Sequence, residues 1–379
     1  MLKLNNLDFL LKKKTFIFFC PVIGDNGISK NLAELSNQLA KKNFKCEIIT
    51  LNYSGKIKKK FFFNKKIKII ESQLFKFKNK IAIYLQCSLK LLMYSLRKDV
   101  IIFAYQANIF AIIISKITFN KIVIRCNIAP SRFITNNVRK IFFKFFYSSV
   151  NKILVTSKDF KREFKKYFNL ESTILKQSLD FKKIYILSKK KNNFKFFKGF
   201  RGLKIINVGR LTDQKNQITL LKAFLKLIKF RPSKLLIVGS GEDKQKLLEF
   251  IKKNHLDKFV KIIPFQNNPF KYILMADVKV LTSKFEGNPN ILMEIAMLRK
   301  LIISSDCKVG PSEILRRGKN GILFKVGKHE TLFKILNNLD LKKENIKKKI
   351  TNSFNYVNNS FQKDVSEDFI NIVKTIYNN

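Results

Sequence analysis

Near its N-terminus the chain reads Thr15-Phe-Ile-Phe-Phe-Cys20-Pro-Val-Ile-Gly-Asp-Asn-Gly27-Ile-Ser-Lys30, and further on it reads Cys46-Glu-Ile-Ile-Thr-Leu51. The first and last runs are β-branched and aromatic, which is typical of buried strands. Between them, the leucines at 32, 35 and 39 recur at helical spacing. A strand, a glycine-bearing loop, a helix and a second strand in this order predict one unit of a parallel sheet covered on both faces.

The same alternation of strands and helices continues along the chain and then restarts after a break. The break is a polar, cationic and aperiodic segment at residues 189–199, which we expect to connect two domains. We therefore expect an α/β protein with two tandem Rossmann-like, doubly wound domains, at residues 1–190 and 200–360. Their strands' carboxyl ends should face a cleft, and the final helix, within 361–379, should return to the first domain. Further strands are expected at residues 67–70, 100–105, 122–126, 153–157, 203–208, 235–238, 260–264, 278–282, 301–304 and 322–324.

The composition is strongly basic, with 76 Lys and Arg against 26 Asp and Glu in 379 residues, a net charge of +50. The chain is also rich in Asn, Ile and Phe, a bias typical of an AT-rich genome, so genome bias is one explanation of the charge. The other is attraction to an anionic surface, either a membrane or a nucleic acid. No zinc finger, helix-turn-helix or RRM pattern is present, so we expect no specific nucleic-acid recognition.

The five cysteines are widely spaced and odd in number, which predicts reduced thiols and neither a disulfide framework nor a zinc site. No signal-peptide pattern is visible. The longest apolar stretch, Val100–Ile114, is interrupted by Gln106 and Asn108 and is too short for a spanning helix. We expect a cytoplasmic protein, or one held peripherally on the inner face of the cytoplasmic membrane.

The stretch Phe285-Glu286-Gly287-Asn288-Pro289-Asn290-Ile291-Leu292-Met293-Glu294 carries two carboxylates eight positions apart, one in a loop and one in an apolar helix. Such a loop presents backbone N–H groups to a ligand, and the carboxylates can accept hydrogen bonds from its hydroxyls. A nucleotide sugar is a ligand of this kind. The alternative is a helix cap with a dipole-favoured acid and no ligand. The spacing alone leaves both open.

A second candidate loop follows the strand expected at residues 203–208. Gly209 lets the backbone turn, and Arg210 and Lys215 follow before the next helix. The guanidinium fork and the ammonium point charge suit a diphosphate. The alternative is a solvated basic loop, which is a stronger explanation for Lys215 than for Arg210 because arginine is scarce in this chain.

Several short motifs then occur in a fixed order. They are Gly209-Arg210-Leu211 with Lys215, Val238-Gly-Ser-Gly241, Ala276-Asp-Val278, Ser283-Lys-Phe-Glu286-Gly287-Asn-Pro-Asn290 with Glu294, Gly310-Pro-Ser-Glu313 and Gly318-Lys-Asn-Gly321. In combination they resemble the retaining GT-B glycosyltransferases of the GT4-type family (glycosyl transferases group 1). The stretch at residues 305–315 is similar to a subgroup that assembles cell-surface polysaccharides and lipid-linked oligosaccharides. The resemblance covers almost all of residues 203–324.

This resemblance implies roles for the residues of the second domain. Glu286 would bind the donor sugar and Glu294 the ribose hydroxyls, while Arg210 and Lys215 would neutralise the leaving diphosphate. It implies retention of configuration by a front-face route, because no carboxylate nucleophile can be placed. No Asp-x-Asp occurs in the chain, so we expect no metal site and no cofactor. Donor-binding residues would be Gly27, Gly209, Arg210, Lys215, Glu286, Gly287, Asn288, Asn290, Ile291 and Glu294.

The first domain matches the family less closely. Gly27 stands where the first loop should approach the donor phosphates. Many relatives carry a cleft histidine here, but His255 and His329 both lie in the second domain. Arg125 and Asn127, at and just past a strand end, are the nearest polar residues by order, and we expect them to face an acceptor or a phosphate.

Two basic aromatic runs occur in the first domain. Residues 56–66 combine lysines with Phe61, Phe62 and Phe63, the composition of a segment that docks on anionic lipid. A solvated loop inflated by genome bias is the alternative. The similar run at residues 139–147 is expected to be a helix packed beneath the sheet.

The leading hypothesis is therefore an enzyme, a hexosyl- or N-acetylhexosaminyltransferase. It would use a nucleotide diphosphate sugar, with UDP favoured, and a lipid-linked or polysaccharide acceptor in the biosynthesis of lipopolysaccharide, capsule or a related surface glycan. Two alternatives are a polyanion- or nucleic-acid-binding protein on a decayed scaffold, which would show a steep salt dependence, and a sugar-nucleotide epimerase of the same architecture.

Overall fold

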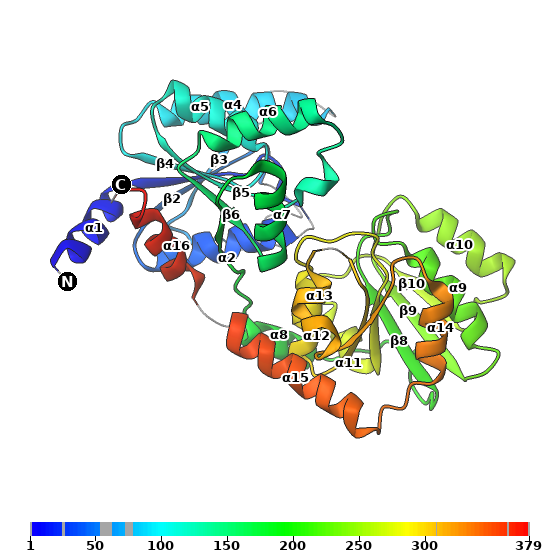
Figure 1. The fold of residues 1–379 in the computed structure, drawn as a ribbon. Helices are drawn as coiled ribbons and strands as arrows, with labels where there is room; N and C mark the ends of the chain where they lie inside the picture. The colour runs from blue at the N-terminus through cyan, green and yellow to red at the C-terminus, as the bar shows by residue number, and fades with distance from the viewer. Residues whose placement is uncertain are drawn as a thin grey trace. The chain divides into compact units, whose positions relative to one another are not determined.

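The structure is a computed structural model that describes residues 2–24, 27–53, 63–72, 79–307, 309–361 and 364–377, and the side chains from residue 7 onward. The chain divides into two compact units, Met1–Ser178 with Lys363–Asn379, and Leu179–Gln362. Each unit is described by itself (Figure 1). Most of the basic aromatic run at residues 56–66 lies outside the described residues, and so do Asp25 and Asn26 of the first loop.

The first unit is built on a parallel seven-stranded sheet of order β3-β2-β1-β4-β5-β6-β7. The central strand β1 pairs with β2 on one side and β4 on the other. In this register Phe16 lies opposite Cys46 of β2 and Ile101 of β4. The sheet order reverses between β1 and β4, as in a doubly wound fold. Its strands are β1 (Thr15–Phe19), β2 (Lys45–Thr50), β3 (Lys68–Glu71), β4 (Val100–Ala104), β5 (Lys121–Arg125), β6 (Lys152–Val155) and β7 (Thr173–Ile174).

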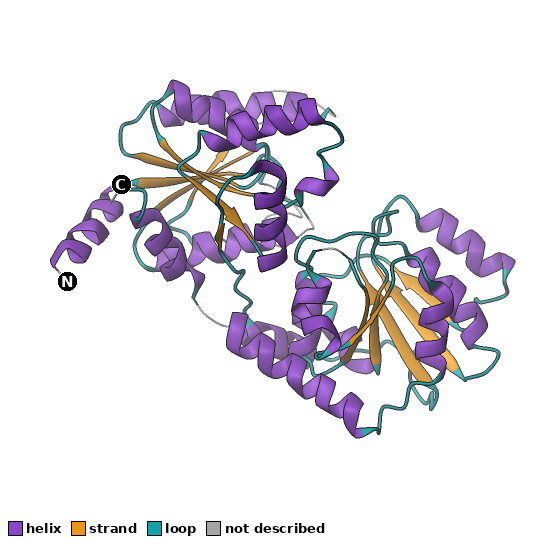
Figure 2. Cartoon of the chain, in the orientation of Figure 1, coloured by secondary structure: helices purple, strands orange, loops and turns teal. Residues whose placement is uncertain are grey.

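Helices lie on both faces of this sheet (Figure 2). Against one face, α2 and α16 bury an aromatic layer in which the rings of Phe103 and Phe369 stack at 4.8 Å. Two ion pairs of 2.9 Å join Lys42, just beyond α2, to Asp364 and Glu367. The helices of this unit are α1 (Leu2–Lys13), α2 (Gly27–Lys41), α4 (Lys80–Ser95), α5 (Asn108–Ile117), η1 (Pro130–Arg132), α6 (Asn137–Ser148), α7 (Lys158–Phe168) and α16 (Val365–Lys374).

One helix of the first unit differs from the sequence-based expectation. The basic aromatic run at residues 139–147 lies in α6, but Tyr147 is the one buried side chain of that helix. Phe145 is 72% exposed and Phe142 48% exposed. The expectation of a helix packed beneath the sheet was therefore wrong, because the neighbouring α7 supplies the phenylalanines that pack there: Phe160, Phe164 and Phe168.

The second unit holds a parallel six-stranded sheet of order β10-β9-β8-β11-β12-β13, which again reverses beside its first strand. Strands β8 and β9 are in register along their full length, from Leu203 opposite Ser233 to Val208 opposite Val238. The sheet is covered on both faces by separate apolar clusters. Its strands are β8 (Leu203–Val208), β9 (Ser233–Val238), β10 (Val260–Ile263), β11 (Val278–Leu281), β12 (Leu301–Ser305) and β13 (Ile322–Phe324).

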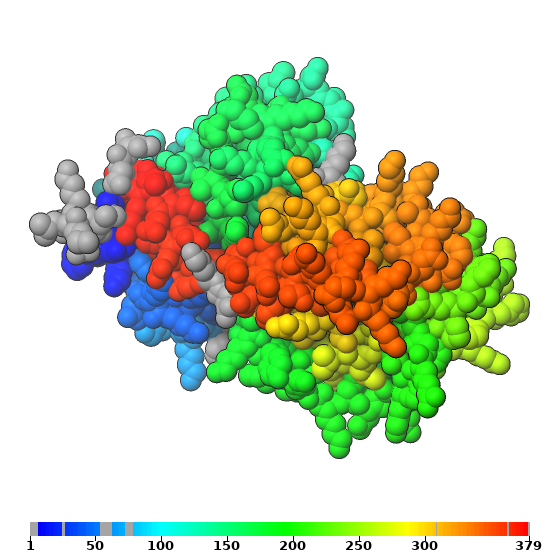
Figure 3. Space-filling view, turned by 60° about the horizontal axis from the view of Figure 1, so that its bottom comes forward, coloured from blue at the N-terminus to red at the C-terminus, as the bar shows by residue number. Residues whose placement is uncertain are grey.

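The helices of the second unit bury one apolar face each, as amphipathic helices on a sheet do. The longest, α15, packs on α12 and has a solvated outer side, which Figure 3 shows in orange-red. They are α8 (Phe181–Ser188), α9 (Gln217–Leu227), α10 (Lys244–Lys253), α11 (Phe270–Met275), α12 (Asn290–Met297), α13 (Pro311–Ile314), η2 (Arg316–Gly318), α14 (His329–Asn337) and α15 (Glu344–Phe361).

The boundary between the units differs from the expected connection at residues 189–199. The first unit ends at Ser178, and α8 already belongs to the second. The cationic segment looked like a solvated connection, but its phenylalanines pack: Phe197 is buried in a core cluster, and the Phe194 ring contacts Tyr272 at 5.2 Å. Helix α16 belongs to the first unit. Among the helices in the described part of the chain, none combines the length and the apolar character needed to cross a bilayer.

Candidate active site

The loop after β8 brings three of the expected site residues to the carboxyl end of the second sheet. Its turn begins at Gly209, whose N–H donates to the carbonyl of Val238 at 3.0 Å. A Cβ at position 239 would stand 1.8 Å from the carbonyl oxygen of Gly209, so glycine is needed at 239 for the two loops to approach. Arg210 is exposed on this loop and Lys215 is half-buried.

The loop after β11 carries Glu286, Gly287 and Asn288 and then enters α12 at Asn290 and Ile291. Gly310 supports it from behind with a φ of +96°, and a Cβ there would stand 2.5 Å from the carbonyl oxygen of Gly287. Both the backbone conformation and the contact require glycine. The expected Gly310-Pro-Ser-Glu turn therefore acts on the site through the position of the Glu286 loop.

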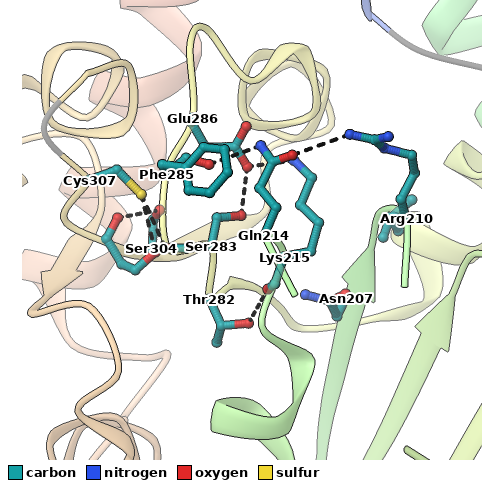
Figure 4. Close-up of polar contacts among 12 residues, drawn as sticks. Asn207, Arg210, Gln214, Lys215, Thr282, Ser283, Phe285, Glu286, Ser304 and Cys307 are labelled. Carbon is teal, nitrogen blue, oxygen red and sulfur yellow. Dashed lines mark hydrogen bonds and ion pairs between the residues drawn. The ribbon is translucent and has the colours of Figure 1, made fainter. Parts of the chain in front are cut away.

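The structure brings Lys215 and Glu286 into direct contact (Figure 4). The Lys215 Nζ lies 2.5 Å from Glu286 Oε1, and the Ser283 hydroxyl donates to the same oxygen at 2.6 Å. The two charged side chains are only 16% and 6% exposed. Glu286 Oε2 accepts no hydrogen bond from any described residue. One oxygen is thus held by the protein, and the other can accept from a hydroxyl of a ligand.

A further set of polar contacts fixes the loop around this pair. Gln214 donates to the carbonyl of Phe285 at 3.0 Å and accepts from Arg210 Nη2 at 3.2 Å. The Thr282 hydroxyl donates to the carbonyl of Lys215 at 3.0 Å. These bonds link the two loops, so Arg210, Lys215 and Glu286 form one cluster within the second unit (Figure 4).

Beneath the cluster lies a cation that the sequence analysis did not single out. Lys279 is fully buried in β11, and its Nζ donates to the carbonyl of Val208 at 3.2 Å. Burial holds its pKa well below the ordinary value of 10.5, Lys215 lowers it further, and Glu294 and Glu286 act in the opposite direction. Glu294 itself is only 3% exposed, on α12. A lysine inside an apolar strand, Val278-Lys279-Val280, was the available signal.

Other residues to which the sequence analysis gave no role lie on these loops or at the strand ends beside them. They are Gln214, Ser283, Thr282 and the Ser305–Cys307 pair that donates to the carbonyl of Ser283. Of these, Ser283 was detectable, because it stands three positions before Glu286 in the same loop. Within the described residues, no group of three or more His, Cys, Asp or Glu is arranged to hold a metal ion.

The first unit holds Gly27, Arg125 and Asn127 at the carboxyl edge of its own sheet. Gly27 is the first residue of α2. Asn127 donates back to the carbonyl of Tyr105 at 2.9 Å, a structural contact. Arg125 is only 2% exposed and lies over the Tyr105 ring at 5.8 Å. Among the described residues, its Nε and Nη2 have no hydrogen-bond partner.

This buried arginine is electrostatically unusual. Burial lowers the pKa of Arg125 from its ordinary value, and the Tyr105 phenol partly offsets that effect. Buried charges are normally paired, because desolvating them is costly. A guanidinium held in this way is suited to an anionic group of a ligand.

Comparison with known proteins finds a family model that covers this site. Residues 188–353 match the family model described as glycosyl transferases group 1. The whole chain has the GT-B fold. It superposes on HepE of Anabaena, solved in complex with UDP-glucose, with a TM-score of 0.78 at 16% identity, covering 96% of this chain and 100% of that one.

Two curated relatives share sequence with parts of the chain. An uncharacterized glycosyltransferase of Methanocaldococcus jannaschii is 33% identical over 220 residues, 53% of this chain and 54% of the relative. A Campylobacter jejuni enzyme is 33% identical over 129 residues, 34% of this chain and 35% of that protein. Its name is N-acetylgalactosamine-N,N'-diacetylbacillosaminyl-diphospho-undecaprenol 4-alpha-N-acetylgalactosaminyltransferase. The matches thus span about half and about a third of these relatives' lengths.

Proposed function

We propose that this chain is a retaining glycosyltransferase that moves a hexosyl or N-acetylhexosaminyl group from a UDP-sugar to a lipid-linked or polysaccharide acceptor in surface-glycan biosynthesis. The observation that carries the proposal is the contact of Lys215 and Ser283 with one oxygen of Glu286, which leaves the other oxygen unbonded among the described residues. A carboxylate held in this way is oriented before a substrate hydroxyl arrives.

Each neighbouring residue has a role in this proposal. Glu286 Oε2 accepts a hydrogen bond from a hydroxyl of the donor sugar. Lys215 remains paired with Glu286 and directs its charge to the diphosphate, and the exposed Arg210 closes on the same phosphates. The first N–H groups of α12, at Asn290 and Ile291, also face the diphosphate. Glu294 binds the ribose hydroxyls.

The transfer breaks the bond between the anomeric carbon and the diphosphate oxygen, and an acceptor hydroxyl forms the new bond on the same face. The acceptor proton passes to the leaving diphosphate oxygen, so charge balances without a protein nucleophile. Lys215 and Arg210 stabilise the charge that builds on the diphosphate, and each such contact contributes about 2–4 kcal/mol in the transition state. In this proposal the cations act in place of a metal ion.

The comparisons support the substrate classes. The Campylobacter jejuni relative is named for transfer to a diphospho-undecaprenol-linked sugar, and HepE was solved with UDP-glucose. The first favours a lipid-linked acceptor, and the second favours a UDP-sugar donor. Arg125 in the first unit, whose Nε and Nη2 have no hydrogen-bond partner among the described residues, is suited to an anionic group of such an acceptor.

A thermal-shift screen with UDP-, GDP- and ADP-sugars tests the donor, because ligand binding stabilises the folded state by mass action. With EDTA in the buffer throughout, we expect the UDP-sugars to raise the melting temperature more than the GDP- and ADP-sugars do. Arg210→Ala should reduce that shift, and Lys226→Ala, an exposed ion-pair lysine of the same unit, should not. The absence of any shift with all three donor classes contradicts the proposal. Salt-sensitive binding of DNA or RNA instead would favour a polyanion-binding protein, and conversion of the donor without an acceptor would favour an epimerase.

A further inference from the structure

The outer side of α4 has an unusual distribution of side chains. Ile81, Leu85, Leu89, Met93 and Leu96 are between 52% and 70% exposed, and their spacing of three or four residues places them on one side of the helix. The buried side of the same helix is mostly small or polar: Gln86, Cys87, Ser88, Leu91 and Ser95. The helix therefore turns its larger apolar surface away from the sheet.

Helix α6 shows the same pattern. Val138, Ile141 and Phe145 are 75%, 68% and 72% exposed, and they also follow helical spacing. Helix α5 adds Ile113 and Ile117, and Phe119 just beyond it is 93% exposed. We call the outer sides of α4, α5 and α6 the apolar face. It carries 11 of the 23 exposed large hydrophobic side chains among the described residues.

These helices are neighbours in the first unit. Helices α4 and α5 pack on each other, and the rings of Tyr84 and Phe110 meet at 6.1 Å. The Asn108 side chain at the start of α5 lies close enough to the Tyr147 phenol of α6 to lower its pKa, against the larger effect of burial. Figure 1 shows the three helices together on one side of the first sheet. The exposed apolar residues thus form one surface, and contiguous apolar surfaces of this kind mark interaction sites.

The charge around the apolar face is of one sign. Between residues 80 and 148 the sequence has eleven lysines and arginines, of which Arg125 is buried and Arg97 is paired with Glu47, and a single acidic residue, Asp99. Helices α4, α5 and α6 contain no Asp or Glu, and Arg139, Lys140 and Lys144 lie between the exposed apolar residues of α6. A protein partner would need an acidic and apolar surface of matching shape. A bilayer with anionic headgroups supplies both properties without a specific shape.

We propose that the apolar face docks this protein on an anionic lipid bilayer, with the exposed side chains of α4, α5 and α6 entering the headgroup region and the flanking cations contacting lipid phosphates. This surface is distinct from the run at residues 56–66, most of which lies outside the described residues. The proposal goes beyond the transferase function and does not depend on it, because docking is measured without donor or acceptor.

Flotation of the full chain with vesicles tests the proposal. We expect the protein to float with vesicles that contain phosphatidylglycerol, and about tenfold less with pure phosphatidylcholine vesicles. Leu89→Gln with Phe145→Gln should lower the partition to anionic vesicles about tenfold or more. The matched control is Ile186→Gln with Phe230→Gln in the second unit, at 52% and 70% exposure against 59% and 72%. The control should float like the wild type.

Circular dichroism melts show whether both double variants are folded, and light scattering reports their oligomeric state. Equal loss of flotation in the control contradicts the location of the docking surface. A wild-type protein that stays in the soluble fraction overturns the proposal. So does a wild-type dimer that the Leu89 and Phe145 substitutions convert to a monomer with flotation unchanged, because the apolar face would then join two copies of the chain.

Discussion

The two units have the same architecture, but they differ in how their charged groups are paired and in how their apolar side chains are buried. In the second unit the site carboxylate Glu286 is bonded to Lys215 and Ser283, and the two loops that carry them are linked through Gln214. In the first unit, Arg125 is buried with two nitrogens that have no hydrogen-bond partner among the described residues, and three helices expose apolar side chains.

The difference separates two kinds of binding surface. A site that the chain itself keeps in order is ready for a small ligand that enters a fixed geometry. A surface with an unpaired buried charge or exposed apolar side chains is kept folded by the stability of the rest of the unit. Such groups gain partners when a ligand or another surface binds. We infer that the second unit binds the small donor and that the first contacts larger, less sharply defined partners.

The most severe test of this difference is Glu286→Ala. We expect kcat/KM to fall by about 100-fold or more, because the donor-sugar contact is lost and Lys215 loses its buried partner. Steady-state kinetics with saturating acceptor measure the loss. Glu330→Ala is the control, because it breaks an exposed ion pair with Lys226 in the same unit and should leave the kinetics unchanged. Near-normal turnover of Glu286→Ala would show that the Glu286 carboxylate is not part of the active site.

A smaller loss is expected for Gly310→Ala. The new Cβ meets the carbonyl oxygen of Gly287 at 2.5 Å in a backbone with a φ of +96°, so the Glu286 loop must move. We expect donor KM to rise about tenfold and the free energy of unfolding to fall by about 1–3 kcal/mol. Gly318→Ala is the control, since it has a similar φ of +93° but nothing within 4 Å of its Cβ. If both variants lose the same activity, backbone strain and not the loop contact is responsible.

The first unit should respond in the opposite sense to the loss of its buried cation. Arg125→Met removes a charge that no described residue pairs, so the free energy of unfolding should rise by about 1–3 kcal/mol. Activity should fall at the same time, because the anionic group of the ligand loses its contact. Urea unfolding and acceptor KM measure the two effects. A variant that is less stable but fully active would show that Arg125 is a structural residue.

Lys279 is an exception to this difference between the two units. It is a fully buried lysine of the second unit, and it forms no ion pair with any described residue. Its folded-state pKa lies below the unfolded value near 10.5, so the unfolded chain binds the proton more strongly. Stability therefore rises with pH between the lowered pKa and about 10.5. Lys279→Met should add about 1–2 kcal/mol at neutral pH, and the gain should vanish as pH rises.

Urea titrations of Lys279→Met and wild type at several pH values measure this effect. Lys204→Met, on the neighbouring strand and half-buried, is the control. A stability difference that stays constant with pH would show that Lys279 does not titrate within the window and that its contribution comes from packing.

Much of the fold could be predicted because strands and helices alternate in composition. The strands at residues 203–208 and 322–324 have the expected bounds. Within the apolar stretch Val100–Ile114, the strand expected at residues 100–105 is β4, and α5 begins at Asn108, just after Ala107 with its φ of +50°. The segment at residues 189–199 was expected to be a solvated connection because it is rich in lysine. Its phenylalanines, Phe194 and Phe197, pack within the second unit instead.

The site was predictable as far as motifs specify residue types. Motifs gave Arg210, Lys215 and Glu286, and the structure places them in one cluster. They could not show that Lys215 and Glu286 contact each other, because that depends on two loops 71 residues apart in sequence. Neither could composition separate α6 from α7, since both are rich in Phe and Lys. Only the position of each helix on the sheet decides which phenylalanines are buried.

Helix α16 has a consequence for the order in which the protein is made. Phe369 stacks on Phe103 within the core of the first unit, so that core is incomplete until α16 has left the ribosome. The whole second unit, Leu179–Gln362, is synthesised in between. The second unit can therefore fold before the first unit is complete. A nascent chain stalled before residue 365 would expose the aromatic layer that α16 covers.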